Sequence, residues 1–381
     1  MISFLFVHKG AIESRLARKN LLPTPHRNRS KRENFWAAIA VCVLTFGSAL
    51  ACKPDLGDPR AGGGRPVSSL LAVGDTGEPW EMLPWLFEGQ LAVGEAMQRE
   101  HADSPVDAFV LLGDNFYPDG LLAHELLPRI VENVARPYCD FIDPSPELVA
   151  LLDRVDRACG RAKQPPPRLL AIIGNHDVLS PGSVDLQRSE VPRFVRNWDM
   201  PAEDSPVLRE LPGGLSLILL VSEWPWGDEQ SDELATALRN ARGPWHVIVG
   251  HRPPIAGHPQ FSGMVARASR ESGRVVHAYL AGHVHGLAAI RGTKSAPALT
   301  VIAGSGSHAN LQEETEYRIE GADVMVEALG FVRVDAFTEP SHPRLSISLL
   351  EARPSAALAF LGTTTIARYD IALDGSVERV E

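Results

Sequence analysis

The chain has 381 residues, of which 44% are hydrophobic, so it can form one large domain or two small ones with a sizeable core. Its net charge of −10 is unevenly distributed: residues 1–34 carry a net +6, residues 35–51 carry no charge, and the remainder carries −16. This acidic main part argues against a nucleic-acid partner, because binding DNA or RNA needs a basic face.

The first predicted element is the apolar segment 35–51, which follows Lys31-Arg32 and ends in Ala49-Leu50-Ala51. A basic region, an apolar region and a small-x-small end are together typical of a secretory signal peptide. We therefore expect residues 1–51 to be a basic leader and signal peptide, and the protein to be exported to the periplasm, the outer membrane or the extracellular space. The alternative is an uncleaved membrane anchor, although the segment is shorter than the roughly 20 apolar residues that a spanning helix needs.

Residues 52–66 are rich in glycine and proline and are predicted to be a flexible tether. Cys52, the first residue after the apolar segment, resembles the lipid-acceptor cysteine of a bacterial lipoprotein. Acylation of this cysteine would attach the protein to a membrane. Simple cleavage and release of the chain is the alternative.

Residues 67–381 are predicted to form one folded domain that begins with a β-α-β unit. Its strands are expected at 67–73 and 107–112, with a helix from Gln90 to His101 between them. A second helical stretch is predicted over 119–136, where leucine, isoleucine and valine recur at helical spacing.

An insertion is predicted at about 137–168, and it contains Cys139 and Cys159. An oxidising compartment favours a disulfide between these two thiols. Closing a loop of about 20 residues in this way would stabilise the fold by about 3 kcal/mol. The alternative is two separate buried thiols.

In the rest of the domain, the pattern of apolar residues changes from continuous runs to alternation with polar residues. Short apolar runs bounded by glycine indicate buried strands, and the stretch from Ser231 to Ala241 indicates a helix. Near the C-terminus, apolar and polar residues alternate, as in antiparallel strands with one solvated face. The buried strands are expected at 215–222, 245–249, 275–280 and 299–303, and the alternating ones at 330–336, 345–350 and 364–371.

Aspartate, asparagine and histidine side chains directly follow the buried strands, in five short motifs that each begin with glycine. The carboxyl ends of strands are where an open α/β sheet gathers its ligands. Within the last of these motifs, His283 and His285 share one face of an extended segment. Oxygen and imidazole donors without a thiolate suit hard or borderline divalent and trivalent metals. The motifs are Gly-Asp-Thr-Gly at 74–77, Gly-Asp-Asn-Phe-Tyr at 113–117, Gly-Asn-His-Asp at 174–177, Gly-His at 250–251 and Gly-His-Val-His at 282–285.

This ordered set resembles the motifs of the calcineurin-like metallophosphoesterase family. The resemblance implies an α/β fold, a four-layer α/β/β/α sandwich of two mixed sheets, with the catalytic domain over 67–381. The general family has Asp-x-His in its first motif, and here the corresponding residues are Asp75-Thr76-Gly77. Glycine therefore stands where the family has a metal-binding histidine. The purple acid phosphatases also lack this histidine and use a tyrosine three residues after the aspartate of the second motif as a metal ligand. Tyr117 stands three residues after Asp114, so the chain is similar to the small, tartrate-resistant type of that branch.

Carried over to this sequence, the resemblance implies two metal ions that share the carboxylate of Asp114. A hard phenolate in place of an imidazole favours a trivalent first ion. The alternative for Tyr117 is a packing aromatic. The implied ligands are Asp75, Asp114, Tyr117 and His285 for Fe(III), and Asp114, Asn175, His251 and His283 for a second ion, Fe, Zn or Mn.

The resemblance also implies a phosphatase that hydrolyses small phosphoric monoesters by in-line attack of a metal-bridging hydroxide, and the predicted signal peptide adds that this enzyme is exported. His176 would protonate the leaving group, Asp177 would orient His176, and His258 would be a further catalytic residue. Arg252 would either bind a phosphate oxygen or form a surface salt bridge. The alternatives are a phosphodiesterase or nucleotidase with the same metals and a non-catalytic binding protein on this fold.

Overall fold

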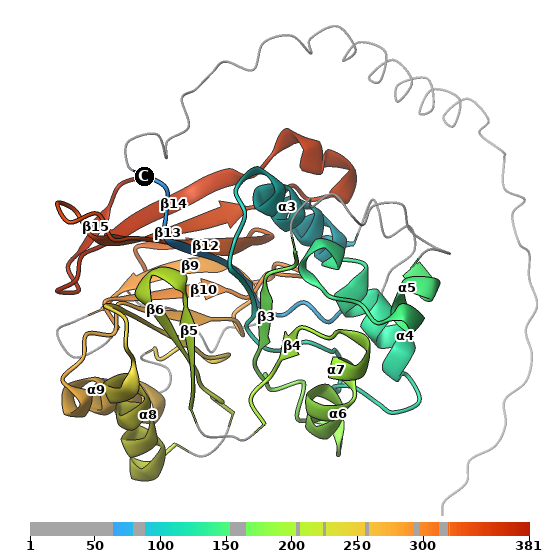
Figure 1. Ribbon diagram of the computed structural model, residues 1–381, viewed down its shortest axis with the longest axis horizontal. Helices are drawn as coiled ribbons and strands as arrows, with labels where there is room; N and C mark the ends of the chain where they lie inside the picture. Colours follow the sequence, from blue (N-terminus) through green and yellow to red (C-terminus); the bar gives the residue numbers. More distant parts are fainter. Residues whose placement is uncertain are drawn as a thin grey trace, which may run out of the picture. The chain divides into compact units, whose positions relative to one another are not determined.

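Two β-sheets pack face to face, and helices cover the outer face of each (Figure 1). The described part of the chain belongs to one unit, Gly64–Glu381. The predicted signal peptide and Cys52 lie outside it. None of the described helices is both long and apolar enough to cross a membrane. The computed structural model describes residues 64–78, 88–152, 165–202, 206–223, 226–255, 259–292, 297–311, 319 and 321–381.

The first sheet has eight strands in the order β15-β14-β13-β12-β1-β2-β3-β4. Strands β1 to β4 are parallel to one another, and β12 to β15 are antiparallel, with β12 pairing antiparallel to β1. The strands are β1 Ser68–Val73, β2 Ala108–Leu111, β3 Arg168–Ala171, β4 Trp198–Asp199, β12 Gly330–Phe337, β13 Arg344–Glu351, β14 Thr364–Ile371 and β15 Val377–Arg379.

The second sheet has seven strands in the order β11-β9-β10-β8-β7-β6-β5. Strands β6, β7, β8 and β10 are parallel, and β5, β9 and β11 pair antiparallel at the two edges. The strands are β5 Val207–Leu211, β6 Leu215–Leu219, β7 Trp245–Val249, β8 Ala278–Ala281, β9 Leu287–Arg291, β10 Leu299–Ala303 and β11 Val324–Val326.

The helices fall into two groups, one for each sheet. The outer face of the first sheet packs against the group from α3 to α7, and that of the second sheet packs against α8 and α9. The first group is α3 Gly89–Asp103, α4 Leu126–Ile130, the π-helical turn η2 Val131–Ala135, the 3-10 turn η3 Cys139–Phe141, α5 Pro146–Leu152, α6 Ser183–Ser189 and α7 Val191–Phe194; the second is α8 Asp228–Asn240 and α9 Pro259–Ser272. Two further 3-10 turns are η4 Pro212–Gly214 and η5 Ala356–Leu361.

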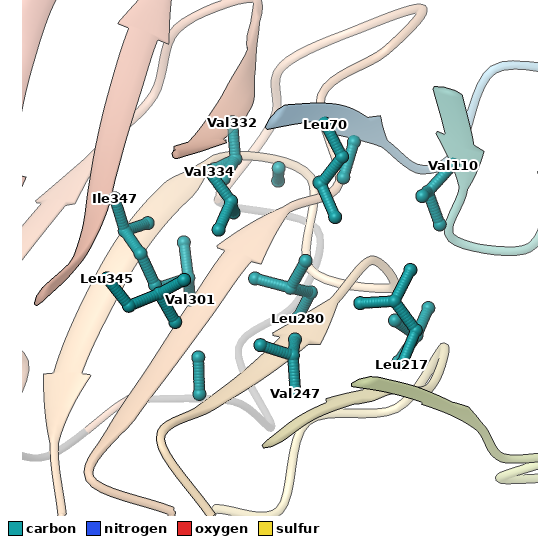
Figure 2. Packing of buried hydrophobic residues seen from close by; sticks show 14 of the residues in the cluster. Leu70, Val110, Leu217, Val247, Leu280, Val301, Val332, Val334, Leu345 and Ile347 are labelled. Atoms are coloured by element: carbon teal, nitrogen blue, oxygen red, sulfur yellow. The ribbon is translucent and has the colours of Figure 1, made fainter. Parts of the chain in front are cut away.

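The inner faces of the two sheets form the main hydrophobic core (Figure 2). Leu70 and Val110 come from the first sheet and meet Val247 and Leu280 of the second, and all four are fully buried. Because side chains alternate along a strand, the neighbours of these residues point outward against the helices. This arrangement is the predicted α/β/β/α sandwich, which is therefore confirmed.

The helical stretch predicted over 119–136 is shorter in the structure. Gly120 has a positive φ of 87°, which a helix cannot contain, and the first turns of the segment are irregular. Helix begins only at α4, with Pro128 in its first turn, where the missing N–H of proline is tolerated. The strands β5 and β9 and the helix α9 are further elements that the sequence patterns do not reveal.

Candidate metal centre

The predicted motifs meet where strands of both sheets end. Asp75, Asp114 and Asn175 follow β1, β2 and β3, while His251 and His283 follow β7 and β8. The loops from the two sheets touch: a Cβ added at Gly74 would lie 2.9 Å from the Cα of Gly282, so glycine is needed for this approach. The backbone N–H of Gly74 also donates to the carbonyl of Ala303 at 2.8 Å. One shared edge of the sandwich therefore collects the polar side chains.

Three of these residues have a backbone conformation that side chains other than glycine rarely adopt. The φ angles of Asp75, Asp114 and His283 are 59°, 52° and 70°. Residues held in such conformations cluster at functional sites, where the surrounding structure maintains them. Here the first two loops hold each other, because Asp75 N–H donates to Gly113 O at 3.0 Å and Thr76 N–H donates to Asp114 O at 3.2 Å.

The other three ligands predicted for the first metal converge on the hydroxyl of the fourth, Tyr117. This oxygen lies 3.0 Å from Asp75 Oδ1, 2.9 Å from Asp114 Oδ2 and 3.1 Å from His285 Nε2. Burial and the two carboxylates raise the pKa of the Tyr117 hydroxyl well above its ordinary value. Two carboxylates, one imidazole and one phenol thus lie together as possible metal ligands. Only a strong nearby cation would ionise the phenol.

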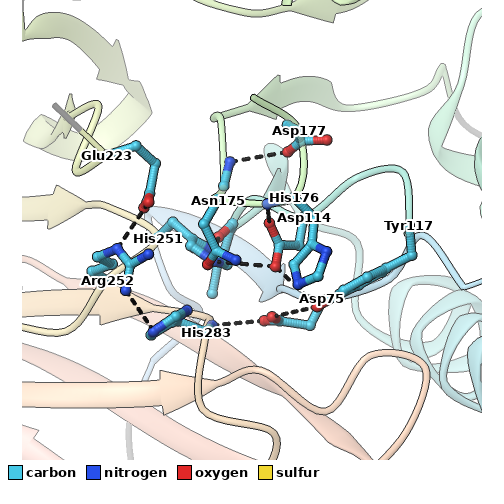
Figure 3. A network of polar contacts seen from close by, with 12 residues as sticks. Asp75, Asp114, Tyr117, Asn175, His176, Asp177, Glu223, His251, Arg252 and His283 are labelled. Carbon is cyan, nitrogen blue, oxygen red and sulfur yellow. Dashed lines mark hydrogen bonds and ion pairs between the residues drawn. The ribbon is translucent and has the colours of Figure 1, made fainter. Parts of the chain in front are cut away.

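The ligands predicted for the second metal lie on the other side of Asp114 (Figure 3). His251 Nε2 is 3.0 Å from Asn175 Oδ1 and 3.4 Å from Asp114 Oδ2. The other ring nitrogen of His251, Nδ1, is 2.8 Å from the carbonyl of Leu112 and must donate to it. This bond leaves Nε2 as the ring nitrogen directed at the centre, the arrangement that metal-binding histidines commonly have. The rings of His251 and His283 lie 5.0 Å apart.

The charge balance of the centre fits a metal group. Asp75 and Asp114 are 0% and 1% exposed, and no Lys or Arg among the described residues pairs with either. Burial raises the pKa of Asp114, but contacts with His251 and His176 outweigh it and hold that pKa below its usual range. Burial lowers the pKa of His251, but the neighbouring carboxylates raise it to about 10. Buried carboxylates need a compensating cation, and donor atoms of Asp75, Asp114 and His251 lie within 4.8 Å of one another.

His176 lies at the open side of the centre and is fixed by its own loop. Its backbone N–H donates to Asp114 Oδ1 at 2.8 Å, and its Nδ1 lies 2.5 Å from the carbonyl oxygen of Pro118. Its ring packs on that of Tyr117 with centroids 4.3 Å apart. Since a carbonyl can only accept, Nδ1 carries a proton, and the second ring nitrogen remains for another partner.

Asp177 has a different place from the one expected, because the His176 ring is held by Pro118 and not by this carboxylate. Asp177 is fully buried and accepts from the backbone N–H groups of Gly174 at 2.9 Å and Asn115 at 3.1 Å, and from Gln187 Nε2 at 2.9 Å. Burial and the nearby Asp114 raise the pKa of Asp177 to about 7. Asp177 therefore ties the loop after β2 to the loop after β3. His258 lies outside the described residues.

The structure adds residues that the sequence motifs do not include. Arg129 of α4 donates from Nη2 to the carbonyls of Gly77 at 2.9 Å and Tyr117 at 2.5 Å, so it holds the first two loops. His308 packs against His285 with ring centroids 4.0 Å apart. A signal for His308 exists in the sequence, because the Gly-Ser-Gly-Ser-His run at 304–308 directly follows a predicted strand. Arg129 has no such signal, since it acts from a helix distant from every motif.

Comparison with known proteins identifies the family of this chain. Residues 68–287, more than half of the chain, match the family model described as calcineurin-like phosphoesterase. The chain therefore belongs to this family and is a metal-dependent phosphoric ester hydrolase.

Two solved structures share the fold at low identity, and a third is a weaker match. GAP50, "the anchor in the inner membrane complex of Plasmodium", is 14% identical, with 75% of this chain and 85% of that chain covered and a TM-score of 0.54. PhoD is 14% identical over 84% of this chain and 72% of that chain, with a TM-score of 0.51. A dimetal phosphatase from Danio rerio is 14% identical over 79% and 99%, with a TM-score of 0.44. No curated protein sequence matches the chain at a significant level.

Proposed function

We propose that this protein is a phosphatase of the purple acid type, which hydrolyses small phosphoric monoesters at a centre of Fe(III) and a second ion, Fe, Zn or Mn. The observation that carries the proposal is the position of the Tyr117 hydroxyl, within 3.1 Å of Asp75, Asp114 and His285 donors. The phenol of Tyr117 thus replaces the neutral histidine ligand that the first motif lacks. A phenolate among carboxylates suits a hard trivalent ion.

Each side chain then has a defined task in hydrolysis. Bound metal ions would supply an activated water and neutralise charge on the phosphoryl oxygens. Asp114 lies between the two donor groups, with Oδ2 facing both Tyr117 and His251. Its second oxygen, Oδ1, accepts the His176 backbone N–H, which fixes the carboxylate's orientation. The chain thus offers one shared carboxylate flanked by two sets of donors.

His176 is the proposed proton donor to the leaving alkoxide. Its Nδ1 proton is engaged by the Pro118 carbonyl, so the ring can present only Nε2 to a substrate and acts as an acid in the doubly protonated form, which becomes neutral after the transfer. The ring is partly exposed and packs against that of Tyr117 at an interplanar angle of 48°, which places it beside the centre. A leaving alkoxide needs such a donor because its conjugate acid is very weak.

The decisive experiment combines metal analysis with a substrate panel of alkyl monoesters, aryl monoesters, diesters and nucleotides. The proposal expects two metal ions per chain, at least one of them iron, and turnover of monoesters well above that of diesters. Preferential cleavage of diesters or of nucleotides would replace the proposal by a phosphodiesterase or a nucleotidase. Two bound metals without any turnover would instead indicate a binding protein, a use of this fold that the anchor protein from Plasmodium makes plausible.

We further propose that the protein is exported and attached to a membrane through an acylated Cys52. The support is the sequence pattern of residues 1–52 alone. Intact-mass analysis of the mature protein tests this: acylation adds the mass of lipid chains to a chain that begins at Cys52, whereas a plain signal-peptidase product lacks them. Peptide mapping without reduction tests the Cys139–Cys159 disulfide in the same sample, because Cys159 lies outside the described residues.

A further inference from the structure

Arg252 directly follows the candidate ligand His251 and is held on three sides. Its backbone N–H donates to Ser222 Oγ at 2.8 Å, and its carbonyl accepts from the Tyr279 hydroxyl at 3.0 Å. Its side-chain Nε donates to Glu223 Oε2 at 2.8 Å. The Glu223 side chain is only 4% exposed. Arg252 is therefore built into the wall of the centre and is not an ordinary surface salt bridge.

The guanidinium of Arg252 points into the centre (Figure 3). Its Nη1 lies 2.8 Å from His283 Nε2. Because a guanidinium nitrogen can only donate, His283 accepts this bond through the Nε2 lone pair. A neutral imidazole has only one such lone pair: a metal on Nε2 would use it, and a metal on Nδ1 would leave the ring proton on Nε2. One lone pair cannot serve both partners, so metal binding at His283 removes the acceptor of Arg252 Nη1.

We propose, on the basis of the proposed phosphatase function, that Arg252 Nη1 exchanges His283 for a phosphoryl oxygen of the substrate when metal is bound, and that Glu223 positions the guanidinium for both states. A guanidinium suits this task because its planar N–H groups match phosphate oxygens. Glu223 also offsets the positive charge of Arg252, which reduces the repulsion between the guanidinium and a nearby metal ion. Arg252 is thus a phosphate-binding residue, and Glu223 is a positioning residue.

The proposal gives Arg252→Ala two effects of opposite sign. Removing the competitor for His283 strengthens binding of the second metal, which we expect as a several-fold lower Kd for Zn²⁺ in calorimetric titration of metal-free protein. Removing the donor to phosphate weakens binding of inorganic phosphate to the two-metal protein by about tenfold or more, the usual worth of a hydrogen bond to a charged group. A merely structural arginine would not produce this pair of changes.

Arg196→Ala is the matched control. Arg196 also pairs with one carboxylate, that of Asp143, but the pair lies on the surface, with side chains 54% and 42% exposed. Its removal leaves both the Zn²⁺ and the phosphate Kd unchanged. Arg252→Ala protein that binds two Zn²⁺ and retains the original phosphate affinity overturns the proposal. So does Arg252→Ala protein that folds but loses the second Zn²⁺.

Two milder variants keep the test sharp if Arg252→Ala does not fold. Glu223→Gln retains the size of the side chain but releases the guanidinium, and we expect phosphate binding to weaken several-fold with two Zn²⁺ still bound. Arg252→Lys retains the charge without the planar donors, and we expect an intermediate loss. Unchanged phosphate affinity in both overturns the proposal. Unmodified protein that binds two metals and phosphate but turns over no monoester would contradict the proposed function while leaving the role of Arg252 intact.

Discussion

Tyr117 is the side chain that most sharply distinguishes this centre from other two-metal centres of the family. The spacing of three residues from Asp114 is enough to predict its placement, because both residues belong to one short loop after β2. The structure adds that its hydroxyl lies among three donors and that burial favours the neutral phenol. Ionisation of Tyr117 should therefore depend on a bound cation.

We predict that iron-loaded, oxidised protein absorbs visible light through phenolate-to-iron charge transfer, and that Tyr117→Phe abolishes the band. The change removes the only phenol within reach of Asp75 and His285 among the described residues, while iron can still bind the remaining donors. Absorption spectra at equal iron content provide the measurement. Tyr138→Phe is the control, since Tyr138 is also fully buried but belongs to the core beside Phe109. A colourless wild-type protein with a full complement of iron would refute the assignment of Tyr117.

His176 shows what motif reading can and cannot provide. The Gly-Asn-His-Asp motif locates His176 next to a ligand, and the structure places it at the open side of the centre. The identity of its anchor is not readable from the motif, because the Pro118 carbonyl belongs to another loop. The same holds for Asp177, whose partners on Asn115 and Gln187 depend on how three separate segments fold together.

We predict that His176→Asn lowers turnover of an alkyl phosphate by about 10²- to 10⁴-fold, the range for loss of a general acid. Asparagine can retain the hydrogen bond to Pro118 but cannot deliver a proton. Turnover of p-nitrophenyl phosphate should fall far less, because its leaving group is stable without protonation. Steady-state kcat/KM for the two substrates gives the comparison. Equal losses on both would show that His176 binds or orients substrate and is not the acid.

Short loops at the ends of strands carry the whole centre, and helix α4 holds two of them. Arg129 is 8% exposed, and its Nη2 donates to the carbonyls of Gly77 and Tyr117. Arg129 thereby fixes the position of the first loop relative to the second. Asp75 and Asp114 lie in these loops and have left-handed backbone conformations. The ends of strands are predictable from apolar runs that stop at glycine. The contact of Arg129 with the two loops is not predictable in this way, because it depends only on how the chain folds in three dimensions.

We predict that Arg129→Met destabilises the fold by roughly 1–3 kcal/mol, because the buried Tyr117 carbonyl loses its donor, whereas the Gly77 carbonyl still accepts from the Tyr117 N–H at 2.8 Å. The metal content after dialysis should fall in parallel, since the loops of Asp75 and Tyr117 lose their brace. Urea unfolding and metal analysis are the measurements. The control is Arg193→Met, which removes an exposed arginine paired with Glu190 and should change stability by less than about 1 kcal/mol. Full stability and metal content in Arg129→Met would contradict the bracing role.

The fold is predictable from the sequence where one face or both faces of a strand are buried. The strands that lead into the motifs are uninterrupted apolar runs, and the C-terminal strands alternate, so both patterns carry information. The edge strands β4, β11 and β15 have two or three residues each, too few for any period. The sandwich of two mixed sheets was expected from the resemblance to a family and not from periodicity, and the order of the strands is seen only in the structure.

The two sheets are also joined at the end opposite to the metal centre, by a buried histidine. His277 precedes β8 of the second sheet and is 1% exposed. Its Nδ1 accepts the backbone N–H of His246 at 3.1 Å, and its Nε2 lies 3.2 Å from the carbonyl of Leu373, in the turn between β14 and β15 of the first sheet. The bond from His246 needs the neutral ring, because a proton on Nδ1 would face another N–H, whereas Nε2 donates to the Leu373 carbonyl in either form. Burial and the neighbouring His246 lower the pKa of His277 to about 4.

We predict that this contact makes the domain less stable in acid. The pKa of His277 is about 4 in the folded protein and about 6.5 in the unfolded chain, so above pH 6.5 neither state binds the proton. Between pH 6.5 and pH 4 only the unfolded chain binds it, and stability falls by about 1.4 kcal/mol per pH unit. From pH 7 to pH 5 the loss attributable to His277 is therefore about 2 kcal/mol.

Urea unfolding of metal-free protein at pH 7, 6 and 5 measures this loss without a contribution from metal release. His277→Gln removes the titrating group, so it should lower stability at pH 7 through the weakened sheet contact but flatten the decline toward pH 5 by about 2 kcal/mol. His124→Gln is the control, because the His124 side chain is 77% exposed and its loss should leave the pH dependence unchanged. Parallel stability curves for His277→Gln and the unmodified protein would show that His277 does not cause the loss of stability in acid.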